Sequence, residues 1–430
     1  FEKSKFDLLL GHRRLSIFDL SINGFQPMTD CANNWIVFNG EIYNFWEIKD
    51  ELIREGFVFS SETDTEVILS AYRHWGTECL KRFNGMWSIV LWDAKNKSLF
   101  ASNDRFGVKP LYYLSNKEEI IFCSEIKQFS SFKKRLGSLN VSNLRTFLDT
   151  GYLDFDETTF FKNVFRFHPR CFAVQSPQSI LSQGFVFQSY FELNVRQIAR
   201  SQKQALEQFD EIFTDAVKIR LRADVPWGVT VSGGIDSSSI LYKVNSLLND
   251  YPGKERIMTF SAVFPGLEGD ESKYINFIEN ELSVNANRVN PLEEFSFDAL
   301  LAHLKCQDYP IQSTSYFAEW CVARLAGASR VKIIINGQGG DEVFAGYHHH
   351  FYQYCKQLIL QGRILEYLRC VKGFSQIKGM DTNKIHRNVL GDFKLMLKFK
   401  LGIAKIDNKL KMEWNKATRL IDILKIDLEK

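Results

Sequence analysis

The stretch 231–240, VSGGIDSSSI, combines two glycines, an aspartate and several hydroxyl groups directly after an apolar run. Backbone N–H groups in such a glycine-rich turn, followed by the start of a helix, favour an anionic phosphate. A Walker A loop carries a lysine after its glycines, and this stretch has none. It therefore predicts a phosphate site unsuited to transfer of a γ-phosphoryl group. The alternative, a plain Gly-Gly turn that caps a helix, stays open for this motif alone.

A second glycine-rich turn follows the apolar run VKIIIN at 331–336 and reads GQGGDEVFAGY at 337–347. Its acidic residues, Asp341 and Glu342, could bind Mg²⁺, orient a ligand or lie in a solvated turn. Ligands bind at the carboxyl ends of parallel strands, so two such turns in one sheet predict a single nucleotide site between them.

The second half of the chain contains the strands that must position these turns. The runs GVTV at 228–231, IMTFSAVF at 257–264 and VKIIIN are nearly continuous in apolar residues and are separated by helical lengths. This pattern is typical of a parallel sheet covered on both faces. A helix is predicted before it, with one apolar face formed by Leu206, Phe209, Ile212, Phe213, Ala216 and Val217.

Residues 1 to about 190 have a different pattern of short apolar or alternating runs separated by Gly, Asn and Asp. These runs predict strands and tight turns. One helix is predicted over 65–75, with Thr63 or Asp64 as its cap. We place the domain boundary near 195–200, which divides the chain into domains 1–195 and 196–430. The predicted strands lie within WIVFNGEIYN (35–44), MWSIVLWDAKNKSLFASND (86–104), KPLYYLS (109–115) and EIIFCS (119–124).

Composition excludes several classes of protein. The 430 residues are 45% hydrophobic and 24% charged, as in globular proteins, and no apolar run is long enough to span a membrane. The eight cysteines show no CxxC spacing, which argues against a zinc site or a disulfide scaffold. Basic residues exceed acidic ones over 351–430 but are spread along helical patterns, so neither nucleic acid nor membrane is an expected partner. The run His348, His349, His350 is interpreted as solvated, and a cytosolic location is expected.

SGGIDSS resembles the pyrophosphate loop, SGGxDS, of the ATP pyrophosphatases. Together with TFSAVF, DESKY at 270–274 and NGQGGDEVFAGY, in that order, it is similar to the synthetase domain of glutamine-dependent asparagine synthetase. The resemblance implies that ATP and Mg²⁺ convert the aspartate side chain to a β-aspartyl-adenylate with release of pyrophosphate, and that ammonia then displaces AMP. Asp236 is the implied catalytic and Mg²⁺-pyrophosphate residue. The implied ATP contacts are Val231, Ser232, Gly233, Gly234, Asp236, Ser237, Ala262, Asn336 and Gly337.

The first half resembles the glutaminase domain of the same family through GHRRLSIFDLS at 11–21, FNGEIYN at 38–44, ETDTEV at 62–67 and NDRFGVKPLYY at 103–113. The resemblance implies an N-terminal-nucleophile αββα sandwich, followed by a doubly wound parallel-sheet ATP-pyrophosphatase domain. Arg14 suits the α-carboxylate of glutamine and Asp64 its α-ammonium group. Asn39 and Gly40 match the oxyanion hole. The implied glutamine contacts are Arg14, Leu15, Ile17, Asn39, Gly40, Glu41 and Asp64.

Several positions depart from the family pattern. The family nucleophile is an N-terminal cysteine, whereas residue 1 is Phe, and Cys31 and Cys79 cannot replace it because an internal residue has no free α-amine. We therefore expect a preceding segment, and we expect the 430 residues alone not to hydrolyse glutamine. The C-terminal part is also expected to be incomplete, because its pyrophosphate-binding lysine is not recognised.

The acceptor site is the other point of difference. Asn336 stands where Ser is usual, and Gln338 where an acidic residue is common. Gln338, Asp341 and Glu342 are therefore assigned to a possible acceptor or intermediate site. Besides an asparagine synthase using glutamine, aspartate and ATP, alone or as a homodimer, two alternatives stay open. One is an amidotransferase for another carboxylate, as in surface-polysaccharide or β-lactam synthesis. The other is a non-catalytic protein that binds nucleotide and glutamine.

Overall fold

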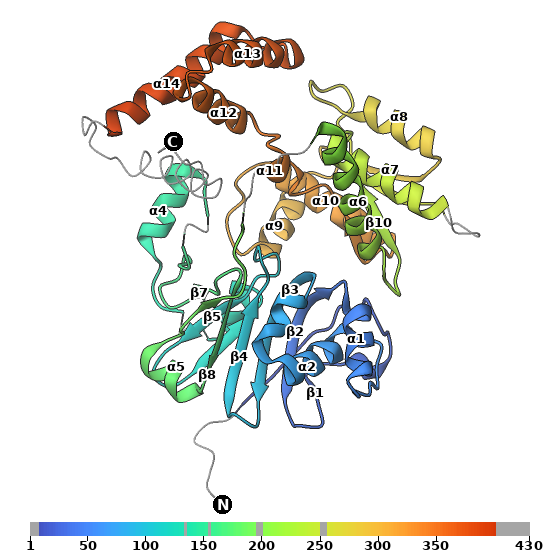
Figure 1. The fold of residues 1–430 in the computed structure, drawn as a ribbon, viewed down its shortest axis with the longest axis vertical. Coiled ribbons are helices and arrows are strands. Elements are labelled where there is room, and N and C mark those ends of the chain that lie inside the picture. Colours follow the sequence, from blue (N-terminus) through green and yellow to red (C-terminus); the bar gives the residue numbers. More distant parts are fainter. Residues whose placement is uncertain (1–7, 133–135, 154–155, 195–200, 250–255, 401–430) are drawn as a thin grey trace, which may run out of the picture. The chain divides into compact units, whose positions relative to one another are not determined.

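The computed structural model describes residues 8–132, 136–153, 156–194, 201–249 and 256–400 (Figure 1). By their contacts these residues form two compact units that divide after Asn336. The first unit contains β1 to β13, and the second contains α11 to α14. The predicted boundary near 195–200 and the predicted loss of a nucleophile at residue 1 both fall outside the described residues. The domain division remains a prediction.

Two antiparallel sheets form the first part of the first unit. The larger has the order β1 (Met28–Thr29), β2 (Trp35–Ile42), β3 (Gly85–Asp93), β4 (Ser98–Asn103), β8 (Cys171–Gln175), β9 (Gln188–Ser189). The smaller has the order β6 (Ile120–Cys123), β5 (Tyr112–Ser115), β7 (Phe165–Arg166). The strands predicted over 35–44, 86–104, 109–115 and 119–124 are confirmed.

Helices and sheets are held together by two apolar cores in this region. One core joins the larger sheet to α1 (Phe45–Arg54) and α2 (Asp64–Trp75) and is formed by Ile36, Phe38, Phe45, Leu52, Ile68 and others. The other joins the two sheets and includes Val90, Ala101, Leu111 and Phe167, with Ile180 from α5 (Pro177–Gln183). Strands β3 and β4 contribute to both cores, with Leu91 and Phe100 in the first and Val90 and Ala101 in the second, which explains their buried runs. The predicted α+β sandwich is confirmed.

The prediction of a single helix in this region is wrong, because α1, α4 (Val141–Thr150) and α5 were missed. The buried positions Phe45, Ile48 and Leu52 of α1 have helical spacing, but Trp46 and Ile53 on the outward face are also apolar and obscure the period. For α2 the prediction holds, with Thr63 as the N-cap accepting from the Thr65 N–H. The remaining short elements are η1 (Ile22–Gly24), η2 (Gly76–Glu78), α3 (Cys79–Arg82) and η3 (Ile126–Phe132).

A parallel sheet forms the rest of the first unit, in the order β12 (Asn285–Val289), β11 (Met258–Ala262), β10 (Trp227–Thr230), β13 (Ile333–Ile335). One face packs on α6 (Gln202–Arg220), α7 (Ile235–Asn249) and α8 (Ser272–Leu282) through a core containing Val229, Leu241 and Ile275. Phe260 packs on α10 (Ser315–Ala328) in a separate core. Helix α9 is Phe297–Cys306. The predicted doubly wound α/β fold is confirmed.

Two details of this part differ from the prediction. Strand β12, with the sequence NANRV, was missed because it is an edge strand that is mostly exposed and therefore has no apolar run. Helix α6 forms as predicted, but Leu206 and Ile212 on its predicted apolar face are 59% and 60% exposed, while Val217 and Ile219 near its end are buried. Apolar periodicity marked the helix correctly but did not identify its buried face.

The second unit is helical, as predicted. It contains α11 (Gly340–Phe344), α12 (His348–Leu360), α13 (Ile364–Lys378) and α14 (Thr382–Lys400), with a core that includes Cys355, Leu358, Val371 and Ile385. Across the described part of the chain, none of the helices is both long and apolar enough to cross a bilayer.

Candidate functional site

The glycine-rich turn 231–236 begins at the carboxyl end of β10 and leads directly into α7. Hydroxyl groups of its own serines hold it in shape. Ser237 is buried, and its Oγ accepts from the Ser232 N–H at 3.2 Å, while Ser238 Oγ donates to the Gly234 carbonyl at 2.6 Å. Because the bonds fix the turn before any ligand arrives, its backbone is preorganised for an anion.

The segment DESKY lies against this turn. Gly233 has a φ of +81°, and a Cβ there would lie 3.0 Å from Tyr274 Cβ, so both the backbone and the neighbouring segment favour glycine. Asp270 organises the start of that segment, because its Oδ1 accepts from the Phe264 N–H at 3.1 Å and from Ser272 Oγ at 2.6 Å. The Ser272 hydroxyl accordingly lowers the pKa of Asp270.

The predicted nucleotide residues of the first unit gather at one edge of the parallel sheet. Val231 follows β10, and its N–H donates to the Phe260 carbonyl of β11 at 3.0 Å. Ala262 ends β11, and Asn336 follows β13, which pairs with β10. Asp236 lies in the first turn of α7. This edge is the usual ligand-binding edge of an open α/β sheet.

Asp236 is the carboxylate of this turn that could contact Mg²⁺. Among the described residues no group of three or more His, Cys, Asp or Glu side chains could hold a metal ion. Mg²⁺ commonly binds through one or two carboxylates together with substrate phosphates rather than in a protein cage. The donor set therefore fits an ion that arrives with ATP.

The other predicted residues of the second turn belong to the second unit. Gly337 accepts from the Gly340 N–H at 3.2 Å, Asp341 accepts through its carbonyl from Gly346 at 2.9 Å, and Gln338 precedes α11. Glu342 Oε1 accepts from the Tyr347 hydroxyl at 2.9 Å. Their role as an acceptor site remains a prediction.

In the first sheet, Asn39, Gly40 and Glu41 lie in register opposite Ser88, Trp87 and Met86. A Cβ at position 40 would lie 2.1 Å from the Met86 carbonyl oxygen and 2.8 Å from Trp87 Cα. No side chain fits between backbones at that distance. Gly40 is therefore required by the close approach of β2 and β3, in addition to any role of its N–H.

Glu41 and Asp64 form a buried carboxyl pair at the end of β2. Asp64 Oδ2 accepts from the Ile42 N–H at 3.0 Å, whereas Glu41 Oε2 is buried and has no hydrogen-bond partner among the described residues. Burial, and then the nearby Asp64 charge, raise the pKa of Glu41 to about 9. Burial raises the pKa of Asp64 to about 6. Two such carboxyls titrate jointly, and near neutral pH the pair retains a proton.

Arg14 is held by the turn that follows it. Its Nη2 donates to the carbonyls of Phe18 and Asp19 at 2.6 and 2.7 Å, and its Nη1 donates to the Ser21 carbonyl at 3.2 Å. These bonds use three of the five guanidinium N–H groups and fix its orientation. Ile17 packs on the core of α1 and α2, and Leu15 is exposed. The two remaining N–H groups, on Nε and Nη1, point in different directions, and the bidentate role of Arg14 is still a prediction.

Two buried residues at the end of β4 were missed as site residues. The Asp104 carboxylate accepts from the N–H groups of Trp87, Phe106, Val108 and Lys109. Asn103 Nδ2 donates to the carbonyls of Trp87 and Lys109. They therefore brace β3 on the side opposite Gly40. The signal in the sequence was the polar pair Asn-Asp that ends the otherwise apolar run SLFASND.

Cys79 lies in the apolar core of α1 and α2, and the histidines of the run 348–350 have aromatic neighbours. Burial strongly raises the pKa of Cys79, which makes its thiolate scarce. His349 stacks on Tyr347, and His348 contacts Phe374.

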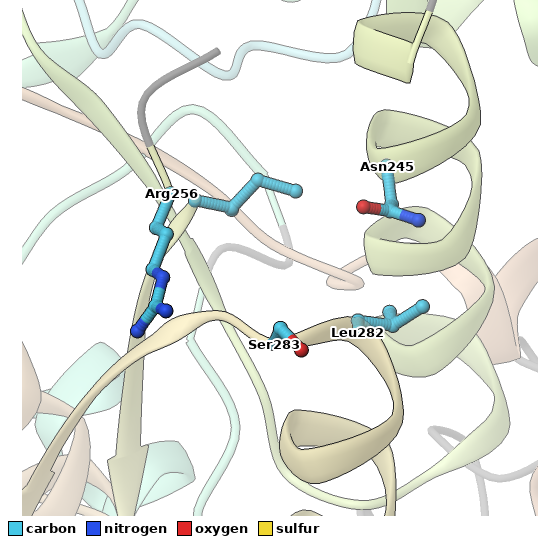
Figure 2. A pocket seen from close by; sticks show the side chains of 5 residues that line it. Asn245, Arg256, Leu282 and Ser283 are labelled. Atoms are coloured by element: carbon cyan, nitrogen blue, oxygen red, sulfur yellow. The ribbon is translucent and has the colours of Figure 1, made fainter.

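A cavity of about 200 Å³, shown in Figure 2, is lined by Asn245, Arg256, Ile257, Leu282 and Ser283. Ile257 immediately precedes β11, so this cavity lies at the amino ends of the strands, away from the glycine-rich turn.

Comparison with known proteins assigns each half of the chain to the family that its sequence motifs predict. A family of glutamine amidotransferase domains matches residues 2–190, and a family described as asparagine synthase matches residues 208–395. A Methanocaldococcus jannaschii protein named as a glutamine-hydrolysing asparagine synthetase is 32% identical over 389 residues, which cover 86% of this chain and 71% of that protein. The chain belongs to the glutamine-hydrolysing asparagine synthetase family.

Two further relatives of this asparagine synthetase family member differ in their names. Asparagine synthetase 1 of Bacillus subtilis is 29% identical over 79% of this chain and 51% of its own length. Amidase chyE of Penicillium rubens is 32% identical over 79% of this chain and 51% of its own length. The chain thus spans about half the length of both proteins. The relatives share the family, whereas the activities in their names differ.

Proposed function

We propose that this protein amidates a carboxylic acid that ATP has activated as an acyl adenylate, with ammonia from glutamine as the nitrogen donor and AMP and pyrophosphate as products. One observation carries the proposal. A preorganised glycine-rich turn without lysine lies at the carboxyl end of β10, in a chain that also contains the buried pair Glu41 and Asp64. Such a turn suits a leaving pyrophosphate, and such a pair suits an ammonium group.

In the synthetase reaction the turn would bind the β- and γ-phosphates of ATP through backbone N–H groups. The acceptor carboxylate attacks the α-phosphorus, the α–β bridging P–O bond breaks, and pyrophosphate leaves with the electron pair. Mg²⁺ would neutralise the charge of the leaving group, and Asp236 would orient that ion. Ammonia then attacks the acyl carbon, and AMP leaves.

In the glutamine site the proposal assigns recognition to Arg14, Glu41 and Asp64. Arg14 would bind the α-carboxylate with the donors that the 18–21 carbonyls do not use. The Glu41 and Asp64 pair would bind the α-ammonium group and give up its shared proton. Asn39 and the Gly40 N–H would stabilise the oxyanion of the tetrahedral intermediate.

Aspartate is the first candidate for the acceptor, as the family suggests. Gln338 favours an acceptor substrate other than aspartate, because glutamine can neither carry a negative charge nor accept a proton as an acidic residue would. The relative named as an amidase supports the same alternative, since it shows that family members carry different activities in their names.

The test is release of AMP and pyrophosphate with ATP, Mg²⁺, ammonium chloride and a panel of carboxylic acids. Ammonia supplies the nitrogen directly, so the assay does not depend on glutamine hydrolysis. AMP formation with aspartate supports asparagine synthesis. AMP formation with another acid, and not with aspartate, identifies that acid as the acceptor substrate. Formation of ADP in place of AMP would refute adenylation.

A pair of variants makes the assay specific. Asp236→Asn should lower pyrophosphate release at least about a hundredfold, because the lost charge orients the leaving group. Asp210→Asn is the matched control, since Asp210 is an exposed carboxylate on α6 that pairs with Lys243. Equal loss in both variants would contradict the role of Asp236.

A further inference from the structure

The connection 221–226 between α6 and β10 contacts both segments of the proposed glutamine site. Asp224 makes two hydrogen bonds to the turn that holds Arg14. Its Oδ2 accepts from the Asp19 N–H at 2.8 Å, and its own N–H donates to the Ile17 carbonyl at 3.0 Å. The two bonds join residues about 205 positions apart in the chain, so they connect the sheet of the glycine-rich turn to the glutaminase sheet.

The turn that Asp224 contacts is part of the glutamine site itself. The Arg14 guanidinium is held by the carbonyls of Phe18 and Asp19, on either side of the Asp19 N–H. Asp19 has a φ of +47°, a conformation that few residues adopt without support. Its Oδ2 also accepts from the Glu62 N–H at 2.9 Å, next to the N-cap of α2 and Asp64. A shift of this turn would therefore move Arg14 and loosen the entry to α2 together.

Arg222 contacts the second glutamine-site segment from the same connection. Its two Nη atoms bind both carboxylate oxygens of Glu47 at 2.9 and 2.6 Å, and Nη1 also donates to the Tyr43 carbonyl at 3.1 Å. Tyr43 follows the β2 end that carries Gly40 and Glu41. The Arg220 guanidinium lies 4.7 Å from the centre of the Tyr43 ring. The bidentate geometry fixes direction as well as distance.

The connection also leads into the strand that carries the phosphate site. Trp227 begins β10 directly after it, and β10 pairs with β11 on one side and β13 on the other. The glycine-rich turn starts at the other end of this short central strand. A displacement of the turn along the strand direction would therefore reach Arg222 and Asp224 through the backbone of β10.

We propose that Arg222 and Asp224 are positioning residues that couple glutamine binding to occupation of the phosphate site. The inference rests on the proposed function, because it takes glutamine and ATP as the two ligands. In this arrangement, nucleotide bound at the turn fixes β10 and the connection, and the connection holds the Arg14 turn and the β2 end in the geometry that binds glutamine. The coupling acts in both directions, as linkage requires.

The experiment is calorimetric titration of the full chain with L-glutamine, in the absence and presence of Mg²⁺ and α,β-methylene-ATP, which cannot be cleaved between the α- and β-phosphates. The dissociation constant for glutamine should be at least about fivefold lower with nucleotide, the lower end of typical coupling. In Asp224→Ala, which removes the oxygen acceptor of the Asp19 N–H, and in Arg222→Gln, the ratio of the two constants should approach one.

Arg82→Gln is the matched control. Arg82 forms a comparable partly exposed ion pair with Glu51 at 2.8 Å, but both residues lie within the glutaminase part. Its ratio should equal that of the wild type. Thermal unfolding of each variant shows whether it is folded, and a variant that only lost stability would keep the ratio.

The outcomes separate this inference from the proposed function. Absence of glutamine or nucleotide binding in the wild-type chain would overturn the proposed function and the inference with it. Binding of both ligands with a ratio of one in the wild type, or with an unchanged ratio in Asp224→Ala, would overturn the inference alone. A ratio of the two dissociation constants near one in both connection variants, with the wild-type ratio kept in Arg82→Gln, would support the inference.

Discussion

Replacing Glu41 with glutamine tests the shared proton of the buried carboxyl pair. Burial and the neighbouring Asp64 raise the pKa of Glu41 to about 9, from about 4.5 for an ordinary glutamate. Between these two values the folded protein retains a proton that the unfolded chain has released. The wild-type protein should therefore lose stability as the pH rises through this range. Glutamine resembles the protonated carboxyl in size and polarity but cannot ionise, so Glu41→Gln should not show this loss.

The size of the effect follows from the number of pH units crossed. The window between about pH 6.5 and about pH 8.5 lies above the pKa of Asp64, about 6, and below that of Glu41. Each unit changes the free energy of unfolding by up to about 1.4 kcal/mol per proton, so over two units the wild type should lose at most about 3 kcal/mol relative to the variant. Proton sharing with Asp64 makes this an upper bound.

The assay is urea unfolding of the wild type and Glu41→Gln across this window, with the difference in free energy of unfolding taken at each pH. Glu118→Gln serves as the control, because Glu118 is an exposed carboxylate in the turn between β5 and β6. Its difference from the wild type should not change with pH. If the difference for Glu41→Gln is equally flat, the folded protein holds no extra proton there, and the reasoning from burial is refuted.

Three further predictions concern the same sites. Binding of glutamine near pH 7.5 should release up to about one proton, because an ammonium group lowers the pKa of both carboxyls; calorimetry in two buffers of different ionisation enthalpy should show the release, and Glu41→Gln should abolish it. Gly40→Ala should cost about 3 kcal/mol of stability, because its Cβ would lie 2.1 Å from the Met86 carbonyl oxygen; an unchanged urea midpoint would contradict the close approach of β2 and β3. Ser237→Ala should raise the KM for ATP in pyrophosphate release about fivefold, since the hydrogen bonds of its hydroxyl to Ser232 and to the Gly234 carbonyl are lost; exposed Ser239→Ala should leave it unchanged.

Local patterns predicted much of the fold and the loops of the candidate site. The runs GVTV, IMTFSAVF and VKIIIN became β10, β11 and β13, because buried parallel strands need apolar residues on both faces. The glycines of the 231–236 turn were recognisable because only glycine adopts the backbone of Gly233 beside Tyr274 without strain. Strand β12 was missed because it is an exposed edge strand without an apolar run. Helix α1 was missed because apolar residues on its outer face obscure the helical spacing of its buried residues.

The sequence by itself determined the chemistry available to this protein: a phosphate turn without lysine, a glutaminase-like segment with Arg14, Glu41 and Asp64, and the family to which they belong. Only the tertiary structure decided which of these groups share an environment. The proton held by Glu41 and Asp64 depends on burial, and the bond from Asp224 to Asp19 joins residues 205 positions apart. Periodicity and motifs describe near neighbours in the chain, whereas desolvation and long-range hydrogen bonds arise only when distant segments pack together.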